Sequence, residues 1–366
     1  WMMVEREMEE KITVKEIARL AGVSIGTVDR VLHDRGGVSA ETKARICGII
    51  ASLGYEPNIL ARQLSLKKTY TFRVIMPRAE QDSGYWDLCL QGIKRAELAL
   101  AMYGCAVRID EIDRYDESSY RELLAEAVED PCDGIVFAPV MPEILGPALA
   151  RLGRNAEEGK LDNPAPYVFF DGDLEGTSPL AVVAQDPFRG GYLAGRVMSL
   201  LSPGTKRLVA HTAPAADRLL AQRIAGFRSF FPDHGHTRRI DAVECPGLDR
   251  TPAGKDALER VFGDAGDVGG VLVANSSGHL AGEWLAAKGL KSRLAVVSWD
   301  AVPDNVRALR EGSLDCLVSQ RPAEQAREAL ELLFRTVVRR EGTPASRFSA
   351  DIPLELYFKE NIPLGE

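Results

Sequence analysis

Residues 13–32 read TVKEIARLAGVSIGTVDRVL, and this stretch carries explicit start and stop signals for two short helices. Thr13 and Glu16 have the spacing of a capping box at the start of the first helix, and Gly22 can supply the left-handed residue that ends it. Ser24 follows as the cap of a second helix, in which apolar residues recur on one face. The stretch therefore predicts two helices joined by a tight turn.

A third helix is expected from Ser39 to Gly54, because apolar residues recur there at helical spacing and Pro57 prevents its continuation. Asn58 can cap a further segment ending at Leu64, which is too short to be stable alone in water. Two helices joined by a glycine-containing turn and closed by a third form a helix-turn-helix module. The chain is therefore predicted to begin with a small all-α head followed by a hinge.

Charge is unevenly distributed along the 366 residues, whose formal net charge is -8. From Lys11 to Lys68 ten basic side chains stand against five acidic ones, whereas the residues after 70 carry a net charge of -10. A basic module on an acidic body is typical of a head that binds nucleic acid, with a merely uneven surface charge as the alternative. The length of the chain predicts about two or three domains.

From Thr71 onward, short apolar runs of β type alternate with helical stretches. The runs include GIVFAP, YVFFDG, LAVVAQD, GGVLVAN and LAVVSWD. Continuous apolar strands with helical crossovers indicate parallel sheets covered on both faces, and there are too many units for one small sheet. The predicted fold is α/β, with two doubly wound parallel lobes behind the head. Neither G-x-G-x-x-G nor G-K-[ST] occurs, which argues against a dinucleotide enzyme or an NTPase.

Polar residues follow the predicted strands where each strand ends. They are Asp171, Asp173, Asp186, Asn275, Asp300 and Gln320. Ligands of open α/β sheets bind at those carboxyl ends, and carboxylates and amides beside aromatic rings suit a neutral polyhydroxylated ligand. Each residue has an alternative role, since Asp and Asn after a strand often cap the next helix.

No metal site, cofactor or membrane span is expected. The six cysteines form no C-x-x-C pair, and His234 and His236, the only close histidine pair, lie in a polar segment. No apolar run approaches the roughly 20 residues that a membrane span requires. The residues before Lys11 lack the pattern of a secretory signal, so a cytoplasmic protein is expected.

Residues 11–70 resemble the DNA-binding head and hinge of the LacI family of bacterial transcription regulators. The motifs that carry the resemblance are TVKEIARLAGVS, TVDRVL, VSAETKARI and LGYEPNILARQL. The resemblance implies that the second helix enters the major groove and that the hinge presents a leucine wedge to the minor groove. Asp29 stands where the family has a small hydroxyl residue. The expected DNA contacts are Thr13, Ser24, Ile25, Gly26, Thr27, Arg30, Asn58, Ala61 and Leu64.

Nearly all of residues 71–340 resembles the effector domain of the same family and the periplasmic sugar-binding proteins of type I. The motifs that carry this resemblance are SGYWDLCLQGI, RIAGF, VLVAN, VVSWD and VSQ. The resemblance implies that aromatic residues pack on a sugar and that Arg223 donates hydrogen bonds to it. Because Arg223 is positively charged, a sugar acid remains an alternative ligand. Gly84 replaces a usual proline, and the acidic residue that sugar binders often carry after the proline of the third strand is missing, its position falling near Met141. The implied ligand residues are Tyr85, Trp86, Asp171, Phe188, Arg223, Asn275, Asp300 and Gln320.

These features together predict a ligand-responsive regulator, a repressor of carbohydrate-utilisation genes that binds a near-palindromic operator as a homodimer and a sugar, polyol or sugar acid between its lobes. The alternatives are a solute-binding protein that delivers a sugar to a transporter, and an enzyme, for which no catalytic grouping occurs. The expected domains are 11–56 for DNA binding, 57–70 for the hinge, and 71–366 for effector binding and dimerisation, in lobes of about 71–185 plus 321–345 and 186–320 plus 346–366.

Overall fold

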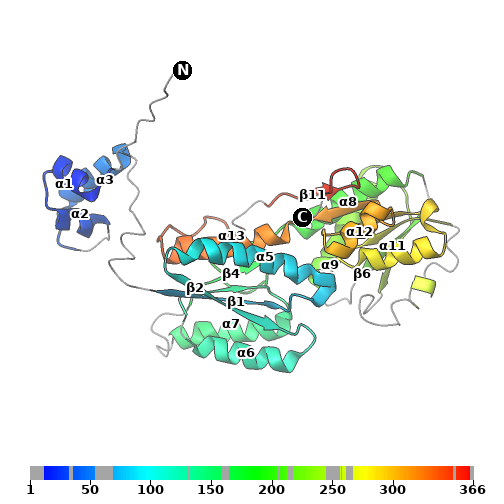
Figure 1. Ribbon diagram of the computed structural model, residues 1–366, viewed down its shortest axis with the longest axis horizontal. Coiled ribbons are helices and arrows are strands. Elements are labelled where there is room, and N and C mark those ends of the chain that lie inside the picture. The colour runs from blue at the N-terminus through cyan, green and yellow to red at the C-terminus, as the bar shows by residue number, and fades with distance from the viewer. Residues whose placement is uncertain are drawn as a thin grey trace, which may run out of the picture. The chain divides into compact units, whose positions relative to one another are not determined.

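The structure is a computed structural model, and it separates the chain into a head unit, Trp1–Lys67, and a body unit, Lys68–Glu366 (Figure 1). The residues that it describes are 12–32, 36–53, 69–130, 132–157, 165–204, 206–212, 217–244, 256, 258–260, 267–348 and 352–362.

The described part of the head consists of three helices, α1 (Val14–Ala21), α2 (Ile25–Leu32) and α3 (Ala40–Leu53). The Thr13 hydroxyl accepts a hydrogen bond from the Glu16 amide at 3.4 Å, and Gly22 ends α1 in the left-handed conformation at φ 64°. The Glu16 carboxylate pairs with Arg19 at 2.6 Å. The predicted start and stop of the first helix are therefore the ones that α1 uses, whereas Gly54, the predicted end of the third, lies outside the described residues.

Each head helix contributes to one small core. Its buried members are Ile17, Ala18, Ala21, Val28, Val31 and Ile46. None of these helices is long enough to be stable alone, so the shared burial of apolar surface is what holds the three together. The predicted helix-turn-helix module is confirmed.

The first lobe of the body is a parallel five-stranded sheet in the order β2-β1-β3-β4-β5. The strands are β1 (Tyr70–Pro77), β2 (Cys105–Ile112), β3 (Gly134–Phe137), β4 (Tyr167–Phe170) and β5 (Ala181–Val183). Helices α5 (Gln81–Ala101) and α13 (Pro322–Val337) cover one face, and α6 (Glu117–Glu129) and α7 (Pro142–Glu157) cover the other (Figure 1). A sheet covered on both faces explains why β3, β4 and β5 are apolar throughout, whereas the edge strand β2 carries charged residues.

The second lobe is a six-stranded sheet in the order β11-β10-β9-β8-β6-β7. Its strands are β6 (Arg207–Thr212), β7 (Ile240–Glu244), β8 (Val268–Val273), β9 (Ala295–Trp299), β10 (Cys316–Ser319) and β11 (Glu355–Tyr357). Its helices are α8 (Pro187–Leu201), α9 (Arg218–Asp233), α11 (Gly278–Ala287) and α12 (Pro303–Glu311), with a 3-10 turn, η2, at Lys291–Arg293.

Successive residues of the central strands of this lobe face different helices. Leu272 and Val297 pack with residues of α8 and α9, whereas Val271 and Val296 pack with residues of α11 and α12. The prediction of two doubly wound parallel lobes is thereby confirmed. One strand differs, because β11 pairs antiparallel with β10 at the edge of the sheet. Its three residues are too short to give a periodic signal in the sequence.

The chain passes between the two lobes after β5, after β10 and between α13 and β11. Helix α13 follows directly on β10 of the second sheet, but it packs against α5 and the strands β3, β4 and β5 of the first. Gln320 therefore lies at a crossing point, between the last residue of β10 and the first turn of α13.

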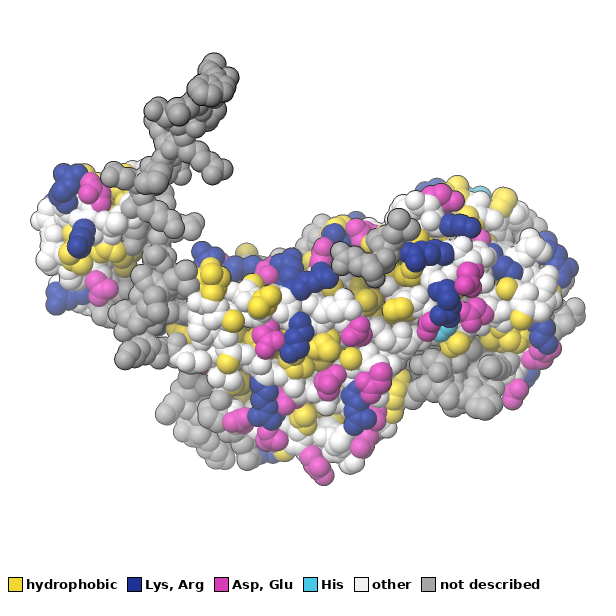
Figure 2. Space-filling model, in the orientation of Figure 1, with side chains coloured by type: hydrophobic (Ala, Val, Ile, Leu, Met, Phe, Trp, Pro, Cys, Tyr) yellow, Lys and Arg dark blue, Asp and Glu magenta, His cyan; other side chains and the backbone are white. Residues whose placement is uncertain are grey.

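Basic and acidic side chains are interspersed over the visible face of the body (Figure 2). Within the described ranges, no helix combines the length and apolar composition that crossing a membrane requires. The same ranges contain no group of three or more His, Cys, Asp or Glu side chains placed to hold a metal ion.

Candidate ligand site between the lobes and DNA-reading head

Two of the acidic residues that follow strands stand in the left-handed backbone conformation, Asp171 after β4 at φ 69° and Asp300 after β9 at φ 56°. This conformation is costly for residues other than glycine, and such strain clusters at functional sites. The chain turns sharply at both strand ends. Three of the six predicted strand-end residues, Asp171, Asp300 and Gln320, enter one hydrogen-bonded group.

That group, called here the interlobe network, consists of Tyr85, Asp171, Arg223, Asp300 and Gln320. The Tyr85 hydroxyl donates to Asp171 Oδ1 at 2.5 Å, and Gln320 Nε2 donates to the Tyr85 oxygen at 2.9 Å and to Asp300 Oδ2 at 3.1 Å. Tyr85 and Asp171 belong to the first lobe and Asp300 to the second. Gln320, at the crossing point, thus joins polar groups of the two lobes.

Arg223 completes the interlobe network from α9. Its Nη1 donates to the Ala274 carbonyl and its Nη2 to Gln320 Oε1, both at 2.8 Å. The guanidinium carbon lies 4.7 Å from the centre of the Trp299 ring, a cation–π contact. Arg223 is only 4% exposed, so its charge must be compensated by neighbouring groups.

The two carboxylates supply that compensation at a cost. Burial raises the pKa of Asp300 to about 6, although the Arg223 guanidinium and the hydrogen bonds from Gln320 oppose the rise. Burial likewise raises the pKa of Asp171, against the Tyr85 hydrogen bond and the Arg223 charge. Both pKa values stay raised although the Arg223 charge lowers them, so this guanidinium does not fully offset the burial of the two carboxylates.

Two predicted ligand residues, Trp86 and Phe188, have other partners. Trp86 is 2% exposed, with its indole donating to Asp82 Oδ2 at 2.7 Å and its ring edge-on to Phe170. Phe188 is 40% exposed and stacks on Tyr192. Within the interlobe network, Tyr85 meets the Trp86 ring edge-on.

The remaining strand-end residues take the capping or pairing roles that the sequence left open. Asn275 Oδ1 accepts from the Ser277 amide at 3.1 Å, just before α11, and Asp186 Oδ1 accepts from the Arg189 amide at 3.1 Å, at the start of α8. Asp173 pairs with Arg347 at 2.6 Å. These three side chains serve local structure in the described conformation.

Sequence reasoning missed a second polar cluster beside the network. The Asp82 carboxylate accepts from Tyr115 at 2.5 Å and pairs closely with Arg114, whose Nη2 lies 3.9 Å from Asp217 Oδ2 in the other lobe. The Asp82 carbonyl accepts from the Ser276 hydroxyl at 2.7 Å, a second contact between lobes. Asp113 follows β2 directly and Arg114 comes next, so the strand-end rule applied to β2 leads to this segment but does not pair Arg114 with Asp217.

Asp82 begins a turn of three consecutive left-handed residues, at φ 53° for Asp82, 60° for Ser83 and 80° for Gly84. Proline cannot adopt a positive φ, which accounts physically for glycine at position 84. Burial by itself would raise the pKa of Asp82, yet the Arg114 charge and the hydrogen bonds that Asp82 accepts outweigh burial and leave that pKa lowered.

Met141, near the position of the missing acidic residue, packs against the core of the first lobe.

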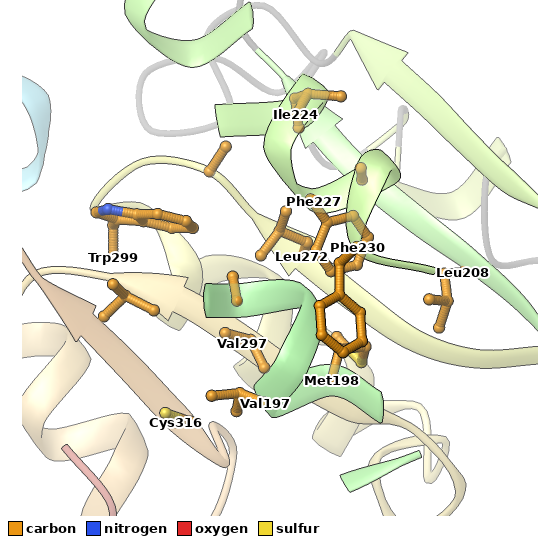
Figure 3. Packing of buried hydrophobic residues seen from close by; sticks show 14 of the residues in the cluster. Val197, Met198, Leu208, Ile224, Phe227, Phe230, Leu272, Val297, Trp299 and Cys316 are labelled. Carbon is orange, nitrogen blue, oxygen red and sulfur yellow. The ribbon is translucent and has the colours of Figure 1, made fainter. Parts of the chain in front are cut away.

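The position of Arg223 depends on a contact between the backbones of α8 and α9. A Cβ atom on Gly191 of α8 would lie 1.8 Å from the Arg223 carbonyl oxygen, and one on Gly226 of α9 would lie 1.9 Å from that of Phe188. Figure 3 shows the apolar cluster around these helices, in which Phe227 and Trp299 take part. The helices can approach this closely only because both positions lack a side chain.

Gly191→Ala is therefore expected to lower the free energy of unfolding by about 1–3 kcal/mol, because the new methyl group forces α9 and Arg223 away from α8. The matched control is Gly190→Ala, whose Cβ would lie in ordinary contact with Trp299 at 3.5 Å. Urea denaturation followed by tryptophan fluorescence measures both. Equal stability of the two variants would show that the crossing is not sterically tight.

In the head, the residues predicted to read bases lie on the side of α2 opposite its core. Ile25 is 49% exposed and Arg30 is exposed, whereas Val28 and Val31 are buried. A Cβ on Gly26 would meet only the Ser24 hydroxyl, at 3.7 Å. The surface of α2 around Gly26, next to Ile25, is thus open.

The other predicted DNA contacts divide into caps and residues that lie outside the described ranges. Ser24 Oγ accepts from the Thr27 amide at 3.2 Å, and its hydroxyl is 2.9 Å from that of Thr27. Thr13 caps α1 in the same way. The hinge residues Asn58, Ala61 and Leu64 lie outside the described residues.

Comparison with known proteins gives matches over both units. Residues 73–340 match the periplasmic binding protein domain, and residues 13–58 match the bacterial regulatory proteins of the lacI family. The HTH-type transcriptional regulator DegA of Bacillus subtilis (strain 168) is 28% identical over 62% of this chain and 62% of its own length. Catabolite control protein A of Staphylococcus aureus (strain MRSA252) is 32% identical over 34% of this chain and 36% of its own. The matched part thus spans less than two thirds of these curated relatives.

Among solved structures, a putative LacI transcriptional regulator from Bacteroides fragilis superposes with a TM-score of 0.70 at 24% identity, covering 80% of this chain and 98% of that one. The glucose-galactose binding protein GanP of Geobacillus stearothermophilus superposes with a TM-score of 0.68 at 19% identity, covering 81% of this chain and 100% of that one. The fold of the body is therefore that of these proteins. The chain belongs to the periplasmic binding protein domain family, and a helix-turn-helix domain of the lacI family precedes that domain at residues 13–58.

Proposed function

We propose that this chain is a ligand-responsive, sequence-specific DNA-binding transcription regulator, a repressor of carbohydrate-utilisation genes that acts in the cytoplasm. The observation that carries the proposal is the combination of a lacI-family head with a polar network that spans both lobes of a binding-protein body. Residues 11–56 read DNA, 57–70 form the hinge, and 71–366 bind the effector and a second copy of the chain.

DNA reading is assigned to the exposed face of α2. Arg30 can donate two hydrogen bonds to guanine, and Ile25 can contact a thymine methyl group, while Gly26 offers no side chain. Ser24 and Thr27 carry hydroxyls suited to phosphate contacts. In the hinge, Leu64 is the proposed minor-groove wedge with Ala61 beside it, following a cap at Asn58. Direct readout therefore depends mainly on Arg30.

Effector binding is assigned to the interlobe network. Its groups belong to both lobes, so a ligand that bonds to them gains more in one relative placement of the lobes than in another. A ligand shifts an equilibrium by its differential affinity for two states, which is sufficient to couple binding to the heads of a dimer. A two-fold dimer matches a near-palindromic operator.

Selection of genomic fragments by the full chain tests DNA reading. At physiological salt we expect enrichment of a few near-palindromic sites, because non-specific phosphate contacts alone give weak binding under that condition. Equal retention of all fragments would contradict sequence-specific binding.

Arg30→Ala is expected to reduce affinity for a selected site by about 1–3 kcal/mol and to relax the preference at one base pair. Lys15→Ala, an exposed basic residue on α1, is the control for loss of charge alone. It should weaken binding to all sequences alike. An unchanged base preference in Arg30→Ala would remove Arg30 as a reader.

A solute-binding protein that delivers a sugar to a transporter is the second candidate, favoured by the fold shared with GanP. That function leaves the lacI-family head without a role. The two candidates differ in one result, since a chain that binds sugars and selects no DNA fragment supports the transporter role.

A further inference from the structure

Both guanidinium groups of the interlobe region are already bonded within the protein. Arg223 donates to the Ala274 carbonyl and to Gln320 Oε1, each at 2.8 Å. Arg114 pairs with Asp82 and lies 3.9 Å from Asp217. Each guanidinium has five N–H donors, so these contacts leave donors for a ligand, but an anionic ligand group there would lie close to the carboxylates that already interact with the same guanidiniums.

Acceptors, by contrast, are in excess. Of the described residues, four carboxylates surround this region, Asp82, Asp171, Asp217 and Asp300, against the two guanidiniums of Arg114 and Arg223.

Two neighbouring ion pairs do not change this balance, because each is neutral in itself. Glu175 pairs with Arg218 at 2.7 Å, and Asp173 pairs with Arg347 at 2.6 Å. Among the described residues, the interlobe region therefore carries more negative than positive charge and offers hydrogen-bond acceptors.

We infer that the ligand is a polyol that carries a protonated amine and no acidic group. This inference rests on the proposed effector role and specifies its chemical class. An ammonium group near Asp171 and Asp300 supplies the missing positive charge, and hydroxyls supply further donors to carboxylate oxygens, each of which can accept more than one hydrogen bond. A sugar acid adds a negative charge where two buried carboxylates share one guanidinium.

The raised pKa values of Asp171 and Asp300 agree with this balance. Burial is the main cause for both; the Asp171 charge raises the pKa of Asp300 further, and the Asp217 charge raises the pKa of Asp171 further. A cation bound beside them relieves this repulsion, since an opposite charge at close range favours the ionised form.

The test compares matched sugars that differ only in charge. Thermal shift and calorimetry of the full chain at pH 7.5 use D-glucosamine, D-galactosamine and D-mannosamine, their neutral parents, and D-glucuronate and D-galacturonate. We expect an amino sugar to bind about 10- to 100-fold more tightly than its neutral parent, with no binding of the uronates. Equal or tighter binding of a neutral sugar or a uronate overturns the inference, as does the absence of binding by all three amino sugars.

Charge-neutral variants locate the effect. Asp300→Asn should abolish the preference for the amino sugar, because it removes one of the two carboxylates that share Arg223. The matched control is Asp267→Asn, which removes one charge from the same lobe at a surface pair with Arg207. It should keep the preference, and its loss in both variants would indicate an effect of overall charge.

Failure of the inference and failure of the proposed function give different results. If neutral sugars bind and Arg223→Met abolishes that binding, the effector role stands while the amine is excluded. If no sugar binds and the full chain selects no genomic fragment, the proposed function fails as well.

Discussion

Arg223→Met is expected to lower the free energy of unfolding by about 3–5 kcal/mol and to abolish ligand binding. Methionine retains the apolar stem, but it leaves Asp171 and Asp300 without the guanidinium that lowers the pKa of each, and it removes the contact with Trp299. The uncompensated buried charge is what makes the effect large. Urea denaturation at pH 7.5, followed by tryptophan fluorescence, measures it.

Two further variants separate charge from packing. Arg228→Met, at an exposed position on the same helix, should change stability by less than about 1 kcal/mol. The double variant Arg223→Met with Asp300→Asn should recover part of the lost stability, because the stability changes of substitutions within one network do not add. Strict additivity of the two substitutions would contradict the proposed charge coupling between them.

Asp300→Asn is expected to change how stability depends on pH. The pKa of Asp300 is raised from 3.8 to about 6 in the folded chain, so the folded state holds its proton more tightly than the unfolded state does. Its contribution to stability is complete below about pH 4 and is lost as the pH rises through 6, a difference of about 3 kcal/mol. Asparagine has no proton to lose at these pH values.

Relative to the wild type, the ligand-free variant should therefore gain about 3 kcal/mol between pH 4 and pH 7. Any hydrogen bond lost to the Gln320 amide shifts the whole profile and leaves this difference unchanged. Unfolding free energies measured in urea across this range give the comparison. Parallel profiles for the two proteins would mean that Asp300 is not buried in an unbalanced site.

Much of the fold follows from local rules that the sequence displays. Thr13 and Gly22 bound α1 because capping and left-handed termination act within a few residues. Apolar runs such as GGVLVAN become strands buried on both faces. The same rules placed Asp300 and Gln320 together, because the carboxyl ends of the neighbouring parallel strands β9 and β10 meet at one edge. Asp171 follows a strand of the other sheet and joins them through Tyr85.

Partner choice among side chains is what local rules do not determine. Asn275 and Asp186 follow strands just as Asp171 does, yet Asp186 caps α8 and Asn275 bonds to the turn before α11, since their partners come from the residues that follow. Trp86 lies beside Tyr85 in the chain and faces Phe170 instead of the network. Arg114 and Asp217 meet only after the two lobes are assembled, so no spacing along the chain announces them.

The dissociation constant of the full chain for a selected DNA fragment, measured by fluorescence anisotropy with and without a ligand that raises its melting temperature, tests most directly whether the interlobe network controls DNA binding. The account predicts a change of about 5- to 150-fold for the wild type and none for Arg223→Met. An unchanged constant at saturating ligand would contradict the coupling on which the proposed function depends.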